Sequence, residues 1–271
     1  MSTQRYGAMF ARCEREGEGA FGAFLTLGDP DPETSYALLM ACVEGGADML
    51  EVGIPFSDPV ADGPVIQAAS QRALAAGVRT DDCFELIARV RAAAGDVPIG
   101  ILTYANLVAA RGRERFAQAA AEAGADSLLV ADVPSLEAPP YAEACRAAGI
   151  DPVFIAAPNA SATTIETISA LGSGYTYCVA RMGVTGQSSG MALDHGDLFA
   201  ALRAHGAPPP VLGFGISTAN QVRAGLKAGA AGVISGSAIV DAAASSDTPV
   251  DAVRDLVAEL KAGTIGAAKG R

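Results

Sequence analysis

Three carboxylic acids, Glu51, Asp58 and Asp62, occur together in the stretch EVGIPFSDPVADGP, residues 51–64. Such groups can transfer protons or stabilise positive charge when the protein removes them from water. Glu51 ends a candidate strand, and alternation along that strand turns it inward if Leu50 and Val52 face outward. An inward carboxylate is partly desolvated, which raises its pKa and suits it to proton transfer near neutral pH. The alternative is a structural acid paired with an arginine.

The two aspartates of this stretch have simpler alternatives. Asp62 stands just before Pro64, which can begin a helix, so it suits a helix cap and a catalytic carboxylate equally well. Asp58, in the sequence S-D-P, is typical of a turn. Asp29 in LGDPDPE and Asp132 in VADVP follow candidate strands and have the same ambiguity. The residues alone therefore leave the role of Asp62 open.

Two glycine-rich turns near the end of the chain indicate a binding site for an anion. GFGIST (213–218) and GVISGSA (232–238) each lead from a candidate strand into a helix. Small residues there let backbone N–H groups and helix N-termini converge on a phosphate. The alternative is a pair of tight turns that need glycine for geometry alone. A third stretch, RMGVTGQSSGM (181–191), has the composition of a lid over a ligand or of a disordered loop.

Residue types that are scarce narrow the chemistry. Lysine occurs only at positions 227, 261 and 269, none of them at a strand end, which excludes a Schiff-base aldolase. The two histidines, at 195 and 205, are too few for a metal site built on several imidazoles. The five cysteines have no C-x-x-C spacing, which favours small buried apolar residues over redox or metal roles. Proton transfer by carboxylates on a phosphorylated substrate remains.

The elements that must position these residues alternate along the chain. Eight short β-rich runs are separated by longer amphipathic runs, most of which end in glycine. The candidate strands are residues 22–27, 48–54, 98–104, 126–132, 151–157, 174–180, 210–216 and 231–236. This pattern predicts an α/β fold, a single (β/α)8 TIM barrel domain over residues 1–271. We expect an extra helix in the first 19 residues and short extra helices after strands two and eight.

An open doubly wound sheet is the second possibility for this pattern. It is disfavoured because the first turn after a strand, LTLGDPDPE, lacks the dinucleotide-binding fingerprint, and no later turn supplies one. The absence of a linker or a shift in composition also favours one barrel over two smaller domains.

Composition and charge set limits on partners and location. Half of the 271 residues are hydrophobic, and the formal net charge is -11. This excess of acids repels phosphate backbones and anionic lipids, so neither a nucleic acid nor a membrane is an expected partner. The N-terminal residues are charged throughout and lack the apolar run of a signal peptide. We therefore expect a cytoplasmic protein.

Several motifs together resemble one enzyme family. FLTLGDP, LEVGIPFSDPVADGPVIQ, YANL, LVADVP, APNA, GYTYCVARMGVTG, LGFGIS and GAAGVISGSAIV occur in the order and spacing of the tryptophan synthase alpha subunit. The resemblance covers nearly the whole barrel. It implies a lyase of tryptophan biosynthesis that cleaves indole-3-glycerol phosphate to indole and D-glyceraldehyde 3-phosphate by a retro-aldol reaction, with no cofactor or metal. It also implies an allosteric alpha2beta2 heterotetramer in which a pyridoxal-phosphate beta subunit receives the indole.

The resemblance also assigns roles to particular residues. Glu51 would be the general acid and base, and Asp62 would stabilise the positively charged intermediate. Tyr177 would contact the substrate, and Thr185 would close the lid onto Asp62. The remaining residues would hold the phosphate (Gly186, Gly215, Gly236 and Ser237) or line the indole pocket (Phe24, Ile66, Leu102 and Phe214). A free-standing indole-3-glycerol phosphate lyase and a non-catalytic allosteric barrel are the alternative functions.

Overall fold

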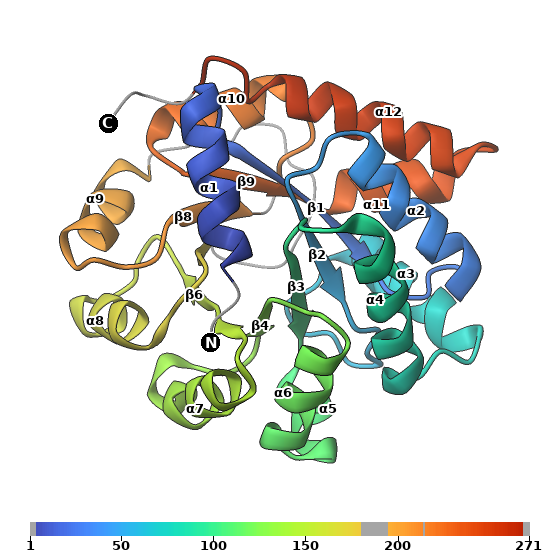
Figure 1. Ribbon diagram of the computed structural model, residues 1–271, viewed down its shortest axis with the longest axis horizontal. Coiled ribbons are helices and arrows are strands. Elements are labelled where there is room, and N and C mark those ends of the chain that lie inside the picture. The colour runs from blue at the N-terminus through green and yellow to red at the C-terminus, as the bar shows by residue number, and fades with distance from the viewer. Residues whose placement is uncertain (1–3, 180–194, 214, 268–271) are drawn as a thin grey trace.

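The computed structural model describes residues 4–179, 195–213 and 215–267. Its strands form one parallel sheet in the order β5-β4-β3-β2-β1-β9-β8-β7-β6. Their bounds are β1 Ala20–Thr26, β2 Met49–Gly53, β3 Ile99–Thr103, β4 Ser127–Val130, β5 Asp151–Pro152, β6 Phe154–Ala156, β7 Thr176–Val179, β8 Pro210–Gly213 and β9 Gly232–Ser235. Helices surround this sheet (Figure 1), which confirms the predicted barrel.

The fifth predicted strand, residues 151–157, is divided in the structure. Its first part, β5, pairs with β4, and its second part, β6, pairs with β7. Pro152 has no N–H to donate to a ladder, and the pairing changes partner immediately after it. The amide of Val153 still donates to the carbonyl of Leu128 at 3.0 Å. The segment therefore closes the barrel as one interrupted strand between β4 and β7.

The helices follow the strands as the sequence predicts. They are α1 Arg5–Glu16, α2 Pro32–Glu44, α3 Pro64–Ala75, α4 Thr80–Ala94, α5 Ala105–Arg111, α6 Arg113–Glu122, α7 Ala138–Ala148, α8 Ala162–Leu171, α9 Gly196–Ala204, α10 Ala219–Ala228, α11 Ser237–Ser245 and α12 Pro249–Ala262, with a 3-10 turn at Ser135–Glu137. Helices α3 and α11 occupy the places after β2 and β9 where extra helices are expected. None of the described helices is long and apolar enough to cross a membrane.

Helix α1 lies across the end of the barrel at which the strands begin (Figure 1). The Tyr6 hydroxyl is 2.8 Å from the hydroxyl of Ser127, the first residue of β4. Arg12 contacts Asp48, which directly precedes β2. Because these contacts reach the strand N-termini, α1 closes the end of the barrel opposite the strand C-termini. This is the extra N-terminal helix predicted from the sequence.

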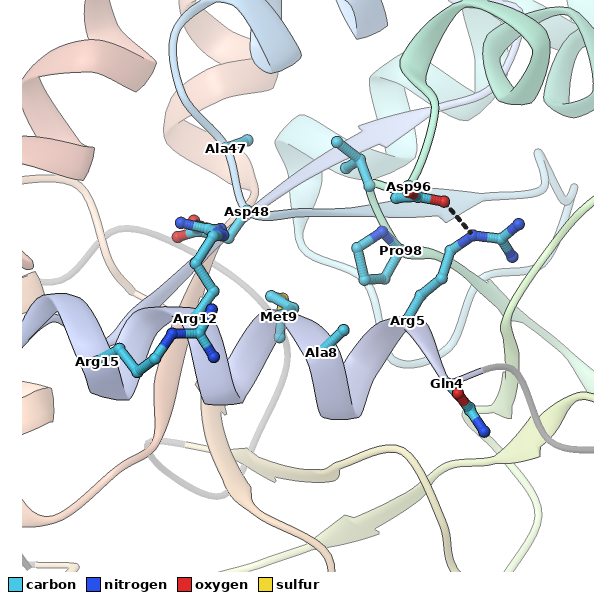
Figure 2. Close-up of a pocket in the computed structure, with 11 residues that line it drawn as sticks. Gln4, Arg5, Ala8, Met9, Arg12, Arg15, Ala47, Asp48, Asp96 and Pro98 are labelled. Carbon is cyan, nitrogen blue, oxygen red and sulfur yellow. Dashed lines mark hydrogen bonds and ion pairs between the residues drawn. The ribbon is translucent and has the colours of Figure 1, made fainter.

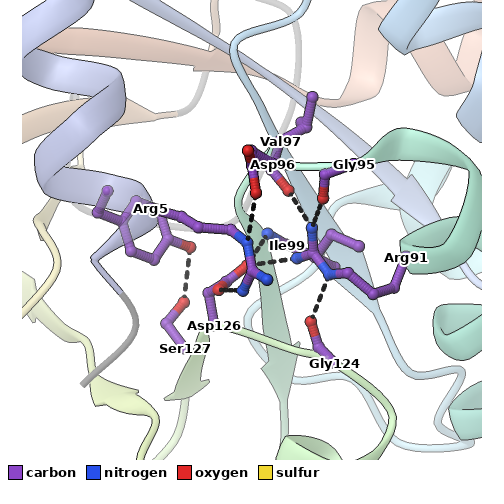
Figure 3. A network of polar contacts seen from close by, with 10 residues as sticks. Arg5, Arg91, Gly95, Asp96, Val97, Ile99, Gly124, Asp126 and Ser127 are labelled. Carbon is purple, nitrogen blue, oxygen red and sulfur yellow. Dashed lines mark hydrogen bonds and ion pairs between the residues drawn. The ribbon is translucent and has the colours of Figure 1, made fainter. Parts of the chain in front are cut away.

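A buried carboxylate, Asp126, fastens α1 and α4 to this end of the barrel (Figure 3). Its side chain is fully buried and accepts from Arg5 Nη1 at 2.8 Å and from Arg91 Nη2 at 2.5 Å. The amide of Ile99 also donates to it, at 2.8 Å. One carboxylate thus balances two arginines and satisfies the first amide of β3.

Replacement of Asp126 by Ala is expected to lower the free energy of unfolding by about 3 kcal/mol, because it leaves the partly buried Arg91 without its charge partner. Urea denaturation measures this loss. Asp96→Asn is the matched control, since the Asp96 side chain is fully exposed and lies 3.6 Å from Arg5. We expect a change of less than about 0.5 kcal/mol there. Equal losses in the two variants would contradict this role of Asp126.

Candidate active site

Glu51 lies inside the barrel on β2, beside Phe24 of β1 and Gly100 of β3 in the sheet register. Only 1% of its surface is exposed. Gly53, two residues further along β2, is on the same face of the strand as Glu51. A Cβ on Gly53 would lie 2.8 Å from the ring of Phe24, a residue of the cavity lining. The structure therefore confirms the inward orientation that side-chain alternation predicts.

The Glu51 carboxylate has one polar partner among the described residues. The Tyr175 hydroxyl donates to Oε1 at 2.8 Å, whereas Oε2 is buried and accepts no hydrogen bond from a described residue. Burial raises the pKa of Glu51 to about 7, the Tyr175 hydrogen bond opposes this rise, and the nearby Asp62 charge adds to it. The alternative role of Glu51 was a structural ion pair with an arginine, and no arginine of the described chain pairs with it. A carboxyl with this pKa is present in both protonation states near neutral pH.

Tyr175 was not singled out in the sequence, although it belongs to the predicted sixth strand. It stands two residues before Tyr177, so alternation places both rings on the same side of the strand. The Tyr175 ring packs against Tyr6 of α1 with 5.3 Å between ring centroids. Gly100 makes room for these groups, because a Cβ there would lie 2.8 Å from the Tyr6 hydroxyl and 3.6 Å from that of Tyr175. The support beneath Glu51 therefore comes from the closing helix as well as from the barrel.

Asp62 lies in the loop between β2 and α3, and 8% of its surface is exposed. Helix α3 has Gly63 as its N-cap and no side-chain cap, so Asp62 is not the helix cap that its sequence context allows. The Gln67 side chain instead donates to the backbone carbonyl of Asp62 at 2.7 Å. Burial raises the pKa of Asp62 to about 6, and a hydrogen bond with Tyr104 opposes the rise. The carboxylate is thus available for another role.

Both carboxylates line one cavity at the C-terminal ends of the strands. The remaining described lining residues are Phe24, Ile66, Leu102, Tyr177, Gly215, Ile234, Gly236 and Ser237. The structure therefore brings together every described residue predicted for the site and adds Ile234. Three predicted residues, Thr185, Gly186 and Phe214, lie outside the described residues.

The two glycine-rich turns border this cavity. Gly236 is the N-cap of α11, and Ser237 is the first residue of that helix. Gly215 has a φ of 74°, a left-handed conformation that favours glycine. Gly213 has a different function, because a Cβ there would lie 2.2 Å from the Tyr177 hydroxyl. The second turn thus directs a helix N-terminus to the cavity, as an anion site requires.

Other acids at the strand ends have structural partners. Asp29 forms a two-pronged ion pair with Arg72, in which both distances are 2.7 Å. Asp132 accepts from the amide of Ala105, at the start of α5, at 2.7 Å. Asp58 is exposed and accepts from its neighbour Ser57. These contacts resolve the ambiguity in favour of structural or turn roles and leave Glu51 and Asp62 as the acids of the cavity.

A second, more open pocket lies beside α1 at the opposite end of the barrel (Figure 2). Its charged groups are largely paired with one another. Arg12 contacts Asp48, and Asp48 also accepts from Lys261 at 2.8 Å. Arg5 lies 3.6 Å from Asp96. Because these charges stabilise the closure by α1, this pocket does not compete with the carboxylate cavity as a candidate active site.

A family model described as "Tryptophan synthase alpha chain" matches residues 10–265, nearly the whole chain. The chain belongs to the tryptophan synthase alpha chain family. The alpha chain of Shewanella baltica strain OS155 is 53% identical over 239 residues, which cover 88% of each chain. That of Aliivibrio fischeri strain ES114 is 47% identical over 264 residues, with 96% of this chain and 98% of the relative covered.

Solved structures show the same fold. A chain of Mycobacterium tuberculosis tryptophan synthase is 32% identical and superposes with a TM-score of 0.87, covering 96% of this chain and 98% of that one. Tryptophan synthase subunit alpha of Legionella pneumophila strain Paris is 31% identical with a TM-score of 0.83, covering 96% and 97%. Family membership confirms the resemblance found in the sequence, and the site supplies the chemistry from which a function is argued.

Proposed function

We propose that this chain is a carbon–carbon lyase of tryptophan biosynthesis that cleaves indole-3-glycerol phosphate to indole and D-glyceraldehyde 3-phosphate. The observation that carries the proposal is the pair of buried carboxylates, Glu51 and Asp62, in one largely apolar cavity. Burial raises the pKa of each. Two acids with different pKa values can serve as a proton-transfer group and as an anionic stabiliser. The reaction then needs no cofactor on this chain.

The reaction begins with a proton transfer from Glu51. Protonated Glu51 gives its proton to C3 of the indole, and the ring nitrogen becomes positively charged. The Asp62 carboxylate accepts the indole N–H and stabilises this charge. Glu51, now ionised, removes the proton of the hydroxyl on the adjacent glycerol carbon. The carbon–oxygen double bond forms, the carbon–carbon bond breaks, and its electron pair returns to the ring, which leaves indole and the aldehyde.

The rest of the cavity matches the two ends of this substrate. Phe24, Ile66 and Leu102 provide the apolar surface for an indole ring. Gly236 and Ser237 are at the start of α11, whose N-terminal N–H groups would bind the phosphate, and Gly215 also lines the cavity. The described donors for a phosphate are the backbone N–H groups at the start of α11 and the Ser237 hydroxyl. Tyr177 would contact the substrate, and Thr185, Gly186 and Phe214 are proposed to complete the site as their positions in the family motifs imply.

A tryptophan synthase beta subunit is the proposed partner, in an alpha2beta2 complex. The beta subunit would carry pyridoxal phosphate and receive the indole. Exposed residues at the catalytic end support a docking surface there: Val60, after β2, is 71% exposed, and Leu136, after β4, is 86% exposed. We also propose that residues 1–271 form one domain and that the protein is cytoplasmic.

The decisive experiment is an indole-release assay with and without a beta subunit. We expect slow release by the chain alone and faster release in the complex. Fast release that a beta subunit does not change would instead support the free-standing lyase. Binding of the substrate without release under either condition would support the non-catalytic barrel.

The pH dependence of kcat/KM is expected to have a narrow maximum between about 6 and about 7. Asp62 must be ionised, so activity rises as pH increases through its pKa of about 6. Glu51 must begin protonated, so activity falls as pH increases through its pKa of about 7. Inhibition by glycerol 3-phosphate, measured over the same range, corrects for ionisation of the substrate phosphate. A kcat/KM that is flat between pH 5 and pH 8 would contradict this assignment of the two carboxyls.

A further inference from the structure

Tyr104 connects the Asp62 loop to the barrel through three contacts. It follows the C-terminal end of β3 and is 2% exposed. Its ring stacks on Phe56 with 5.3 Å between centroids and 28° between planes. Its hydroxyl accepts the amide proton of Ala61 at 3.3 Å and also lowers the pKa of the adjacent Asp62 carboxyl. One side chain thus contacts the loop near its start and again at the functional acid.

The backbone of Tyr104 is itself firmly held. Tyr104 is the N-cap residue of α5, and its carbonyl accepts the amides of Leu107 at 3.1 Å and Val108 at 3.4 Å. The next amide, of Ala105, donates to Asp132 at 2.7 Å. The side chain therefore projects from a fixed strand end, whereas the loop that it contacts has no secondary structure between β2 and α3.

We propose that Tyr104 is a positioning residue that holds the Asp62 loop against β3 and sets the orientation of the Asp62 carboxylate in the cavity. This inference rests on the proposed function, in which Asp62 must meet the indole N–H. The other described anchor of Asp62 is the Gln67 side chain, which holds the backbone carbonyl at 2.7 Å but leaves the carboxylate free to rotate. Tyr104 holds the loop on the other side of Asp62, through the Ala61 amide and the Phe56 ring, and its hydroxyl acts on the carboxylate itself.

The hydroxyl of Tyr104 also favours the ionised form of Asp62, because a donor stabilises a carboxylate. The titratable groups that interact with Asp62 are Glu51 and Tyr177, and Asp132 interacts with Tyr104. The acids among them disfavour a further negative charge, and no described lysine, arginine or histidine lines the cavity. Loss of the Tyr104 hydroxyl therefore removes the described group that favours the ionised form of Asp62, and the pKa of Asp62 is expected to rise.

Tyr104→Phe tests this inference, because phenylalanine keeps the ring and its stacking while removing the hydroxyl. In the indole-release assay, the acid limb of kcat/KM is expected to move upward by about one pH unit. At pH 6 the variant is then expected to have roughly one fifth of the wild-type kcat/KM, and the ratio is expected to recover toward pH 8. A purely structural role would lower the ratio equally at every pH and would overturn the inference.

Two further variants make the result specific. Phe56→Leu removes the stacking but keeps the hydroxyl, so we expect a lower kcat/KM without a shift of the acid limb. Tyr36→Phe, on α2, is the matched control for loss of a tyrosine hydroxyl away from the cavity, and no change is expected. An unmoved acid limb in an active Tyr104→Phe enzyme would overturn the positioning role alone. Absence of indole release by the wild-type chain, alone and with a beta subunit, would overturn the proposed function first.

Discussion

Replacement of Glu51 by Gln is expected to stop indole release while the fold and phosphate binding remain intact. Glutamine has nearly the same shape and can still accept the Tyr175 hydroxyl, which lies 2.8 Å from Glu51 Oε1. It cannot give a proton to indole C3 or remove one from the glycerol hydroxyl. Loss of a positioned acid or base costs ~10² to 10⁴ in rate, and Glu51 serves both transfers, so kcat is expected to fall by about 10⁴ or more. Steady-state indole release measures this change.

The stability of the same variant provides its control. The pKa of Glu51 is raised from 4.5 to about 7 in the folded protein. Because the folded state binds this proton more tightly than the unfolded state, the related stability is present at low pH and is lost as pH rises through about 7. At pH 8 the free energy of unfolding of Glu51→Gln is therefore expected to exceed that of wild type by on the order of 2 to 3 kcal/mol, and at pH 4 the two are expected to be equal. Urea denaturation at both pH values measures this difference. Normal turnover would refute the assignment of Glu51.

The general position of the site could be predicted from the sequence because it depends on local patterns. Parallel strands place their C-terminal ends together, so Glu51 and the glycine-rich turns had to meet at one end of the barrel. Side chains alternate between the two faces of a strand, and this alternation was sufficient to predict that Glu51 points inward. The spacing of glycines before α11 likewise indicated the turn that presents Gly236 and Ser237 to the cavity.

The contacts that adjust the two acids could not be predicted in the same way. The Tyr175 hydroxyl reaches Glu51 across 124 positions of the chain, and Tyr104 reaches back 42 positions to Asp62. Such pairs depend on the barrel closure and on the path of a loop without a repeating pattern. The helix-cap interpretation of Asp62 failed for a related reason: a cap depends on backbone geometry at one residue, and here Gly63 occupies that position. The division of the fifth strand required knowledge of both neighbouring strands.

Asp62→Asn is expected to lower kcat by ~10² to 10³ with a much smaller effect on KM, because positive charge on the indole develops only as the reaction proceeds. The amide oxygen of asparagine can still accept the indole N–H in the ground state. It carries no charge to stabilise the intermediate. The acid limb of the pH profile, which reports ionisation of Asp62, is expected to disappear in the variant. Kinetics of indole release over pH 5 to 8 measure both effects.

The Asp58→Asn variant distinguishes the charge of Asp62 from the integrity of the loop. Asp58 belongs to the same loop, but it is exposed and accepts only from Ser57 among the described residues. We expect its loss to leave the chain's own indole release within about twofold of wild type, as is usual for surface positions. A comparable loss in both variants would show that the loop, rather than the carboxylate, limits the rate. A raised KM with an unchanged kcat in Asp62→Asn would make Asp62 a binding residue. The proposed mechanism requires a lower kcat, because in it Glu51 transfers the protons and Asp62 stabilises the charged intermediate.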